Sequence, residues 1–436
     1  MNAPREEKPK IISTVSWILY DLANTTYSMN VVSLYFSTWV VLGLGQSDFW
    51  VSLVNSVSMI LVAITMPVLG DWSDRKSKKL PALFIFTFTC VTGTLLIGVL
   101  GQSIKSVTVL LPVILILYII SNYSFQGGLV FYNALLPEVA TERSMGRVSG
   151  YGVAFGYIGS IMGLIVARLF VEGDAFGLTI PGIEGNGRVA AFVPTALMFA
   201  LFALPIFIFV NERTVGYKET QSWKINESYK RVWRSLKNTR EHPGLLRFLI
   251  AKLLYEDSIQ TVIIFMGLYT QAVMGFSNEE ANQFFIVIIP TAVIGSAIFG
   301  MLSDHFGPKR TLFAVILMWC AGLLAVILTD NVTLFWLLGA CIGILLGATW
   351  TAARPLLISL VPRENLGEFF GLYALSGKVA AITGPLIWSG VAYLFSNYGN
   401  VIKYKAAIGA LVILMFIGAL ILRGVPDLHV NFKDNK

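Results

Sequence analysis

Twelve apolar runs, each about as long as a membrane-spanning helix, dominate the sequence. Crossing the hydrocarbon core takes about 20 apolar residues in helical form, and short polar connections separate the runs. The sequence therefore predicts an all-α integral membrane protein with twelve transmembrane helices. The tenth run has the weakest boundary, because Arg354 and Pro355 interrupt it. The predicted helices begin near Ile12, Phe49, Leu80, Val107, Arg147, Val189, Leu245, Ala281, Thr311, Thr333, Glu368 and Ala406.

The low content of charged residues excludes a soluble protein. Only 13% of the 436 residues are charged, whereas soluble domains carry roughly 25%. Metal-binding and catalytic motifs are also missing, since the chain has three separated cysteines, three separated histidines and no HExxH, Walker or GxSxG motif. We therefore expect no enzyme activity, no metal site and no cofactor.

Lysine and arginine are distributed very unevenly between the two sides of the predicted helices. Of the 32 such residues, four lie in the odd-numbered connections and four inside the predicted helices, which leaves 24 on the other side. Positive loops face the cytoplasm, so both termini are expected there. Short loops and a modest length favour a prokaryotic cell (inner) membrane, with a vacuolar membrane as the alternative. Because topology accounts for the basic charge, no nucleic-acid partner is expected. The four in connections are Lys105, Arg188, Lys403 and Lys405, and the four inside are Arg168, Lys252, Arg354 and Lys378.

One long polar segment divides the chain into two halves of six helices. Residues 1–210 form the first predicted bundle, 211–244 a cytoplasmic basic linker, and 245–436 the second bundle with a short cytoplasmic tail. The linker is rich in Lys, Arg, Trp and Tyr, which favours an amphipathic helix on the anionic lipid surface. A regulatory partner site is the alternative.

The two halves share an internal repeat. Three short motifs recur in the same order, 225 to 235 residues apart, as expected for a duplicated unit of six helices. Parallel repeats of this kind place a substrate site at the repeat interface near the bilayer midplane. The pairs are Leu19-Tyr20-Asp21 with Leu254-Tyr255-Glu256, Gly70-x-x-Ser73-Asp74 with Gly300-x-x-Ser303-Asp304, and Leu136-Pro137 with Val361-Pro362.

Two polar connections carry a family likeness. Residues Gly70–Lys79 (GDWSDRKSKK) resemble the signature loop of the major facilitator superfamily, and Gly300–Arg310 (GMLSDHFGPKR) resembles its second copy. The resemblance implies the major facilitator fold of two pseudo-symmetric six-helix bundles, with Asp74 and Asp304 holding the halves in one conformation. Ser77 stands where the family usually has glycine. The implied conformational-gate residues are Gly70, Asp74, Arg75, Gly300, Asp304 and Arg310.

A narrower likeness covers most of the chain. Tyr20–Tyr27, Tyr255–Thr261 and Glu368–Lys378 resemble motifs of the vacuole-effluxer-like branch of that superfamily, and Asn133–Glu138 fits the end of its fourth helix. Glu256 is a departure, because a neutral residue is commoner there. Fungal members are associated with release of amino acids from the vacuole, so the resemblance implies a transporter, with amino acids as the first substrate class.

Ionisable residues deep in a span are costly and mark a pathway by default. Asp21, Glu256 and Asp257 are the predicted coupling acids, and Lys378 is the predicted counter-ion or anchor for a substrate carboxylate. Two structural alternatives remain. Lys252 and Glu256 are four residues apart and can neutralise each other, and Asp21 can be satisfied by neighbouring hydroxyl groups.

Polar residues at helical spacing predict the wall of a substrate cavity. Lipid penalises such stripes, so they are expected to face the bundle interior, with interhelical hydrogen bonding as the alternative. Glycines at Gly156, Gly159 and Gly163 instead predict close helix packing. The predicted cavity residues are Tyr20, Asp21, Asn24, Tyr27, Asn122, Gln126, Tyr255, Glu256, Asp257, Gln260, Tyr373 and Lys378.

These patterns predict a secondary active transporter that moves a small polar solute by alternating access between two bundles. Amino-acid efflux coupled to protons is the first hypothesis, by symport or antiport. The expected partners are the small-molecule substrate, protons and membrane lipid, and a monomer is expected. Organic anions, peptides or drugs are the alternative substrates, and a membrane sensor or enzyme is the alternative class.

Overall fold

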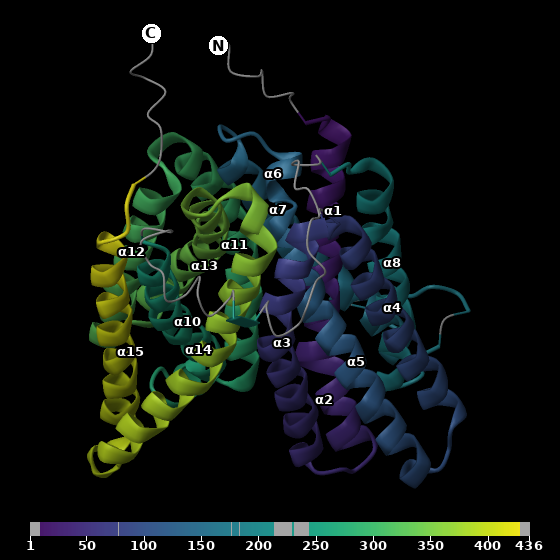
Figure 1. The fold of residues 1–436 in the computed structure, drawn as a ribbon. Helices are drawn as coiled ribbons and strands as arrows, with labels where there is room; N and C mark the ends of the chain where they lie inside the picture. The colour runs from purple at the N-terminus through teal and green to yellow at the C-terminus, as the bar shows by residue number, and fades with distance from the viewer. Residues whose placement is uncertain are drawn as a thin grey trace, which may run out of the picture. The chain divides into compact units, whose positions relative to one another are not determined.

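The computed structural model describes residues 9–76, 78–175, 177–182, 184–212, 229–230 and 244–427 (Figure 1). The linker predicted at 211–244 therefore lies almost entirely outside the described residues. In unit order along the chain, the helical elements are α1 (Ile11–Tyr27), η1 (Ser28–Tyr35), α2 (Phe36–Thr38), η2 (Trp39–Gly43), α3 (Asp48–Lys76), α4 (Lys79–Ser103), α5 (Val107–Ala134), α6 (Leu136–Val139), α7 (Met145–Glu172), η3 (Arg188–Ala191), α8 (Phe192–Phe209), α10 (Leu245–Ala272), α11 (Asn278–Phe306), α12 (Pro308–Leu328), α13 (Val332–Leu360), η4 (Arg363–Asn365), α14 (Leu366–Leu394), η5 (Ser396–Tyr398) and α15 (Gly399–Arg423).

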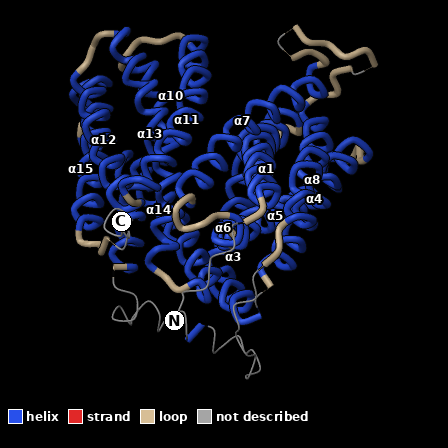
Figure 2. The backbone as a smooth tube through the Cα atoms, turned by 90° about the horizontal axis from the view of Figure 1, so that it is seen from above, coloured by secondary structure: helices blue, strands red, loops and turns tan. Residues whose placement is uncertain are grey.

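A long helical segment lies at each of the twelve predicted positions, which confirms the all-α membrane fold. In the described ranges, nine helices are long and apolar enough to cross a membrane by length and composition. The first span starts as α1, and most of its second half is π-helical in η1 and η2. Figure 2 shows the described chain as helices joined by loops.

Two helix boundaries differ from the sequence-based prediction. The polar signature segment was expected to be a connection, but α3 continues to Lys76 and α4 begins at Lys79. The end of an apolar run marks where lipid contact ends. The helical hydrogen bonds of the backbone continue past that point, where polar side chains such as Asp71 and Arg75 pair four residues apart. At the tenth span, whose boundary was the weakest in the sequence, α13 continues through Pro355 to Leu360 and so ends where the repeat motif predicted.

The chain forms two compact units. Unit 1 comprises Met1–Glu142 and Phe155–Trp223, and unit 2 comprises Arg143–Ala154 and Lys224–Lys436. The boundary therefore falls inside α7, whose first part belongs to unit 2 and whose second part belongs to unit 1. The predicted division into residues 1–210 and 245–436 stays a prediction.

Aromatic pairs hold the first span of unit 1 against α5. Their ring centroids lie 4.4 Å apart for the first pair, 4.7 Å for the second and 3.8 Å for the third. Through these three contacts the residue numbers rise along the first span and fall along α5, so the two segments are antiparallel. Such pairs add about 0.5–1.5 kcal/mol each beyond their buried area. They are Trp17 with Tyr132, Tyr27 with Phe125, and Phe36 with Tyr118.

Within unit 1, glycines on α7 allow that helix to pack tightly against α1, as the sequence predicted. A methyl group added at Gly159 would lie 2.4 Å from the Leu22 carbonyl oxygen. The Thr26 hydroxyl donates a hydrogen bond of 2.9 Å to the Gly159 carbonyl, so backbone contact replaces side-chain packing here. In unit 2, Gly295 brings α11 similarly close to the backbone of Ile344 on α13.

Candidate functional site

Asp257 lies on α10 in unit 2 and is only 1% exposed. Its carboxylate accepts a hydrogen bond of 2.7 Å from the Thr383 hydroxyl and one of 2.6 Å from the Gly384 backbone N–H, both on α14. In the described part of the chain, these neutral donors are its polar partners and no cation forms an ion pair with it. We call Asp257, Thr261, Thr383 and Gly384 the Asp257 cluster.

Two glycines, seven residues apart on α14, bring that helix close to α10. A methyl group at Gly384 would lie 2.0 Å from the Thr261 hydroxyl and 2.6 Å from an Asp257 carboxylate oxygen. At Gly377 it would lie 3.1 Å from both the Lys252 ammonium and the Glu256 carboxylate. Glycine is therefore required at 384 for the backbone N–H to reach Asp257, and the same face of α14 also meets the Lys252–Glu256 pair.

Lys252 and Glu256 form an ion pair one turn before the Asp257 cluster. Lys252 is 1% exposed, donates a hydrogen bond of 3.1 Å to the Tyr373 carbonyl, and lies 3.9 Å from the centroid of the Tyr373 ring. We call Lys252, Glu256 and Tyr373 the Lys252 cluster. The neutralisation weighed from the sequence is therefore present, and Lys252 has its charge and its donors satisfied.

An aromatic stack lies beyond the Asp257 cluster along α10 and α14. Phe265 of α10 stacks on Trp388 of α14 at 4.8 Å, and Trp388 stacks on Tyr404 of α15 at 6.0 Å. Trp388 is 2% exposed. Phe265 lies eight residues after Asp257 on α10, and Lys252 lies five residues before it, so the aromatic stack and the Lys252 ion pair lie on opposite sides of Asp257 along the helix.

Unit 1 contains a matching arrangement around Asp21. Asp21 and Asp257 are 236 residues apart, and each carbonyl accepts a hydrogen bond from the threonine one turn later, Thr25 or Thr261. A glycine faces each threonine, Gly156 on α7 or Gly384 on α14. The structure thus extends the sequence repeat, with Asp257 rather than Glu256 as the spatial counterpart of Asp21, which is 5% exposed.

The first polar stripe contributes to the interior of unit 1. The Tyr20 hydroxyl hydrogen-bonds Thr87 on α4 at 2.5 Å, and the Tyr20 ring stacks on Tyr132. Tyr20 and Tyr27 are 1% and 0% exposed. For Tyr20 the interhelical bonding that was the alternative is therefore present. Asn24 is buried, and its amide nitrogen lacks a hydrogen-bond partner in the part of the chain that the structure describes.

The second polar stripe forms a small network between α3 and α5. The Asn55 side-chain carbonyl accepts hydrogen bonds from Tyr118 at 2.8 Å and from Asn122 at 3.3 Å. The side-chain carbonyl of Asn122 is buried and finds no hydrogen-bond partner among the residues described, and Gln126 is half-buried one turn later. Neither Asn55 nor Tyr118 was among the residues predicted from the sequence, although Tyr118 continues the four-residue spacing of Asn122 and Gln126.

In unit 2 the remaining predicted cavity residues gather unevenly. Tyr255 is 1% exposed, and among the described residues its hydroxyl has no hydrogen-bond partner. Gln260 is half-buried on the same helix. The side chain of Lys378 lies outside the described part of the structure. The assignment of all these residues to a substrate cavity stays a prediction.

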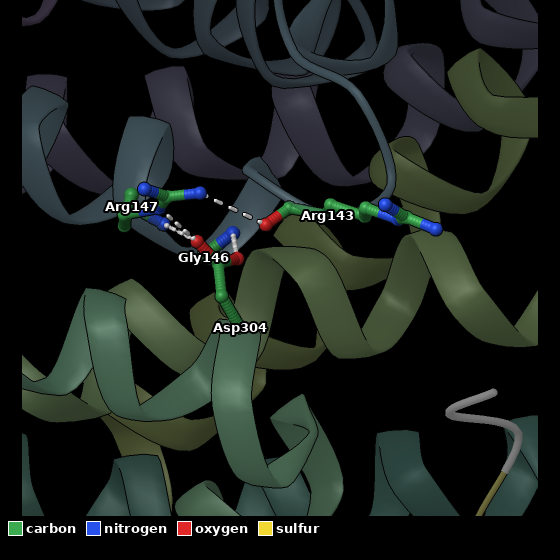
Figure 3. Close-up of polar contacts among 4 residues, drawn as sticks. All are labelled: Arg143, Gly146, Arg147 and Asp304. Carbon is green, nitrogen blue, oxygen red and sulfur yellow. Dashed lines mark hydrogen bonds and ion pairs between the residues drawn. The ribbon is translucent and has the colours of Figure 1, made fainter. Parts of the chain in front are cut away.

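Asp304 binds the start of α7 within unit 2 (Figure 3). Its carboxylate accepts hydrogen bonds from the backbone N–H of Gly146 at 2.6 Å and of Arg147 at 3.1 Å, and the Arg147 side chain pairs with it at 2.8 Å. The first backbone N–H groups of a helix have no intrahelical acceptor, and the helix dipole favours an anion there. Asp304 therefore satisfies a helix start from a different helix.

The crossing of α7 over α11 is very close at this point. A methyl group at Gly300 would lie 2.8 Å from the Gly146 carbonyl, and one at Gly150 would lie 2.4 Å from the Ser296 carbonyl. The Ser149 hydroxyl also donates to the Thr351 carbonyl on α13 at 2.9 Å. Gly300, one turn before Asp304, therefore allows the carboxylate to reach the first turn of α7.

The first copy of the signature has different contacts. Arg75 pairs with buried Asp71 at 3.1 Å, and Asp74 lies 3.6 Å from Lys79 at the start of α4. Gly70 is buried, and its carbonyl accepts from Ser73. The roles of these residues as a conformational gate stay predictions.

In each unit, an acidic residue that follows the last long helix binds the start of another helix, which is α4 in unit 1 and α12 in unit 2. In unit 1, Glu212 accepts a hydrogen bond from the Leu80 backbone N–H. Burial raises the pKa of Glu212, while that hydrogen bond and nearby Lys79 oppose the shift. In unit 2, Arg310 at the start of α12 pairs with Asp427 at 2.7 Å.

The contact of Asp304 gives a first testable prediction. Asp304→Asn should slow transport about thirtyfold and lower thermal stability in detergent, because hydrogen bonds to a charged group contribute about 2 kcal/mol. Asp330→Asn is the matched control, since Asp330 also pairs at 2.7 Å, with Lys405, but its side chain is 83% exposed. Exposed pairs contribute little. Equal effects of the two substitutions would contradict a special role for Asp304.

Three comparisons with known proteins agree with this fold. The chain is 29% identical over 422 residues to the uncharacterized MFS-type transporter YxiO of Bacillus subtilis (strain 168), covering 94% of each chain. It is 26% identical to the multidrug resistance protein MdtG of Rahnella sp. (strain Y9602), covering 88% of this chain and 87% of that protein. The solved structure of the proton:xylose symporter XylE matches with a TM-score of 0.70 at 14% identity, covering 96% and 95%.

The family comparison identifies the branch. The family described as "Vacuole effluxer Atg22 like" matches residues 140–429, which is more than half of the chain. The match includes the Asp257 cluster, the Lys252 cluster and Asp304. The protein is a multi-pass membrane transporter of the major facilitator superfamily, and it belongs to the vacuole effluxer Atg22 like family.

Proposed function

We propose that this transporter exports small polar solutes, amino acids first, in exchange or co-transport with protons, and that Asp257 carries the coupling proton. One observation carries the proposal: Asp257 is buried on α10, the helix at the position of the predicted seventh span, and its described partners are neutral. An ionised carboxylate at such depth costs on the order of 3 kcal/mol. Two donors offset part of that cost, so a change in either donor alters the balance between the acid and its carboxylate.

The neighbouring acid is less suited to that task. Glu256 has a cationic partner in Lys252, so its ionised form is already compensated. The two donors to Asp257 bind its ionised form better than its protonated form, because a carboxyl oxygen that carries a proton accepts one hydrogen bond fewer. We therefore assign coupling to Asp257, and Glu256 to the arrangement of Lys252 and Tyr373.

The substrate class rests on the family. The matching family is described by a vacuole effluxer, and amino acids are the solutes that the sequence resemblance implies. Drug export is the second candidate, because the relative MdtG is named a multidrug resistance protein. The bacterial relatives favour a cell membrane as the location.

The test is flux in proteoliposomes that contain the purified full-length chain. A mixed amino-acid pool is read by mass spectrometry, with and without an imposed pH gradient, beside a set of lipophilic cations. Saturable amino-acid movement that responds to the gradient supports the proposal. Movement of the cations alone would replace amino acids with drugs, and solute movement that ignores the gradient would remove protons as the coupling ion.

A further inference from the structure

Helix α14 has an intrinsic weak point next to the Asp257 cluster. Pro385 lies inside the helix and has no backbone N–H, so the carbonyl four residues earlier lacks its helical donor. The proline ring also presses against the preceding turn, which makes proline the usual cause of a helix bend. The two residues immediately before Pro385, Thr383 and Gly384, are the ones that bind Asp257.

The bond from Gly384 is unusual for a helix interior. A backbone N–H in that position ordinarily donates to the carbonyl four residues earlier. Here the Gly384 N–H points to an Asp257 carboxylate oxygen 2.6 Å away, on a different helix. The carboxylate therefore competes with the internal hydrogen bonds of α14 at the turn that proline has already weakened.

We propose that Thr383 and the Gly384–Pro385 turn link the protonation of Asp257 to the bend of α14. The inference rests on the proposed function, in which Asp257 carries the proton. Ionised Asp257 accepts from both donors and holds the turn open toward α10. A proton on the carboxyl removes one acceptor site, so Gly384 N–H returns to the helix ladder and the turn closes.

Thr383 has a specific part in this exchange. A hydroxyl group both donates and accepts, whereas a backbone N–H only donates. Thr383 can therefore donate to the carboxylate and accept from the protonated acid, so it keeps α14 attached to Asp257 in both states. Beyond Pro385, the stack of Trp388 on Phe265 and Tyr404 fixes the second half of α14, which makes the Thr383–Pro385 turn the pivot.

Charged and titratable groups on the neighbouring helices have partners other than Asp257. On α10, Lys252 and Glu256 pair with each other, and on α14 the Tyr373 ring lies over Lys252. On α15, Tyr404 belongs to the aromatic stack. Within the described residues, the hydrogen-bond partners of the Asp257 carboxylate are Thr383 and Gly384.

The experiment compares Thr383→Val with Thr383→Ser in the proteoliposome assay. Valine keeps the size but not the hydroxyl, so the ionised carboxylate loses a donor and the pH of half-maximal transport should rise by about one unit. The solute ratio reached in a fixed pH gradient should fall toward one. Serine keeps the hydroxyl and should behave like the unaltered protein in both measurements.

Further variants separate the two proposals. Thr383→Ala removes the hydroxyl without adding bulk and should repeat the valine result if Thr383→Val folds poorly. Loss of the gradient response in Asp257→Asn, together with an unchanged pH midpoint in the valine and alanine variants, would overturn the role of Thr383 and leave the proposed function intact. An unchanged gradient response in Asp257→Asn would instead remove the proposed function itself.

Discussion

Asp257→Asn is expected to abolish gradient-driven accumulation while solute exchange continues. A pH difference of one unit stores about 1.4 kcal/mol, so coupling to one proton supports a solute ratio of about ten. Asparagine has nearly the same shape as aspartate but takes up no proton, so the ratio should fall to about one. Exchange persists because the amide oxygen still accepts from a donor on α14.

The measurement is the steady solute ratio across the vesicle membrane, with counterflow as the index of exchange. The solute ratio does not depend on how much protein is incorporated, so poor expression does not mimic the result. Asp21→Asn is the matched control, because Thr25 and Gly156 repeat the setting of Thr261 and Gly384. Loss of the ratio in Asp21→Asn but not in Asp257→Asn would place the coupling acid in unit 1.

The fold could be predicted from the sequence almost completely, for a simple physical reason. Lipid forces each span to satisfy its own backbone, so an apolar run of sufficient length has one regular structure open to it. The ends of the helices were harder, because α3 keeps its helical ladder through Asp71 and Arg75 after its apolar run has ended. Hydropathy measures contact with lipid and carries no signal for that continuation.

The site was predictable where charge was the signal. Asp257, Glu256 and Tyr373 were expected in one region, and the structure joins Glu256 and Tyr373 through Lys252, whereas Asp257 binds Thr383. The residues that hold Asp257 were missed, since a threonine and a glycine are ordinary in a membrane helix. The spacing of Gly377 and Gly384 by seven residues was the available signal, because that spacing places two small residues on one helix face.

The partner of Asp304 was missed for a different reason. The sequence resemblance marked Asp304 but gave no indication that its acceptors would be filled by the backbone of Gly146 and Arg147. Backbone donors have no residue type and leave no trace in a sequence. The glycine pattern of Gly146, Gly150 and Gly300 becomes informative only after α7 and α11 are known to cross there.

Lys252→Met is expected to destabilise the protein strongly. The substitution keeps the length of the side chain but leaves the Glu256 carboxylate, 15% exposed, without its cation and the Tyr373 carbonyl without its donor. Removing one partner of a buried ion pair typically costs about 3–5 kcal/mol. The measurement is the thermal unfolding midpoint in detergent, followed by the fraction of protein that remains monodisperse.

The double variant Lys252→Met with Glu256→Gln decides what the ion pair is for. A neutral pair removes the uncompensated charge, so most of the lost stability should return, because replacing both partners of a buried pair is often nearly neutral. Its solute ratio in a pH gradient should also match that of the unaltered protein, since the coupling acid Asp257 is intact. Recovered stability with a lost ratio would show that Glu256 carries the proton, and the structural role of the pair would then be secondary to its part in coupling.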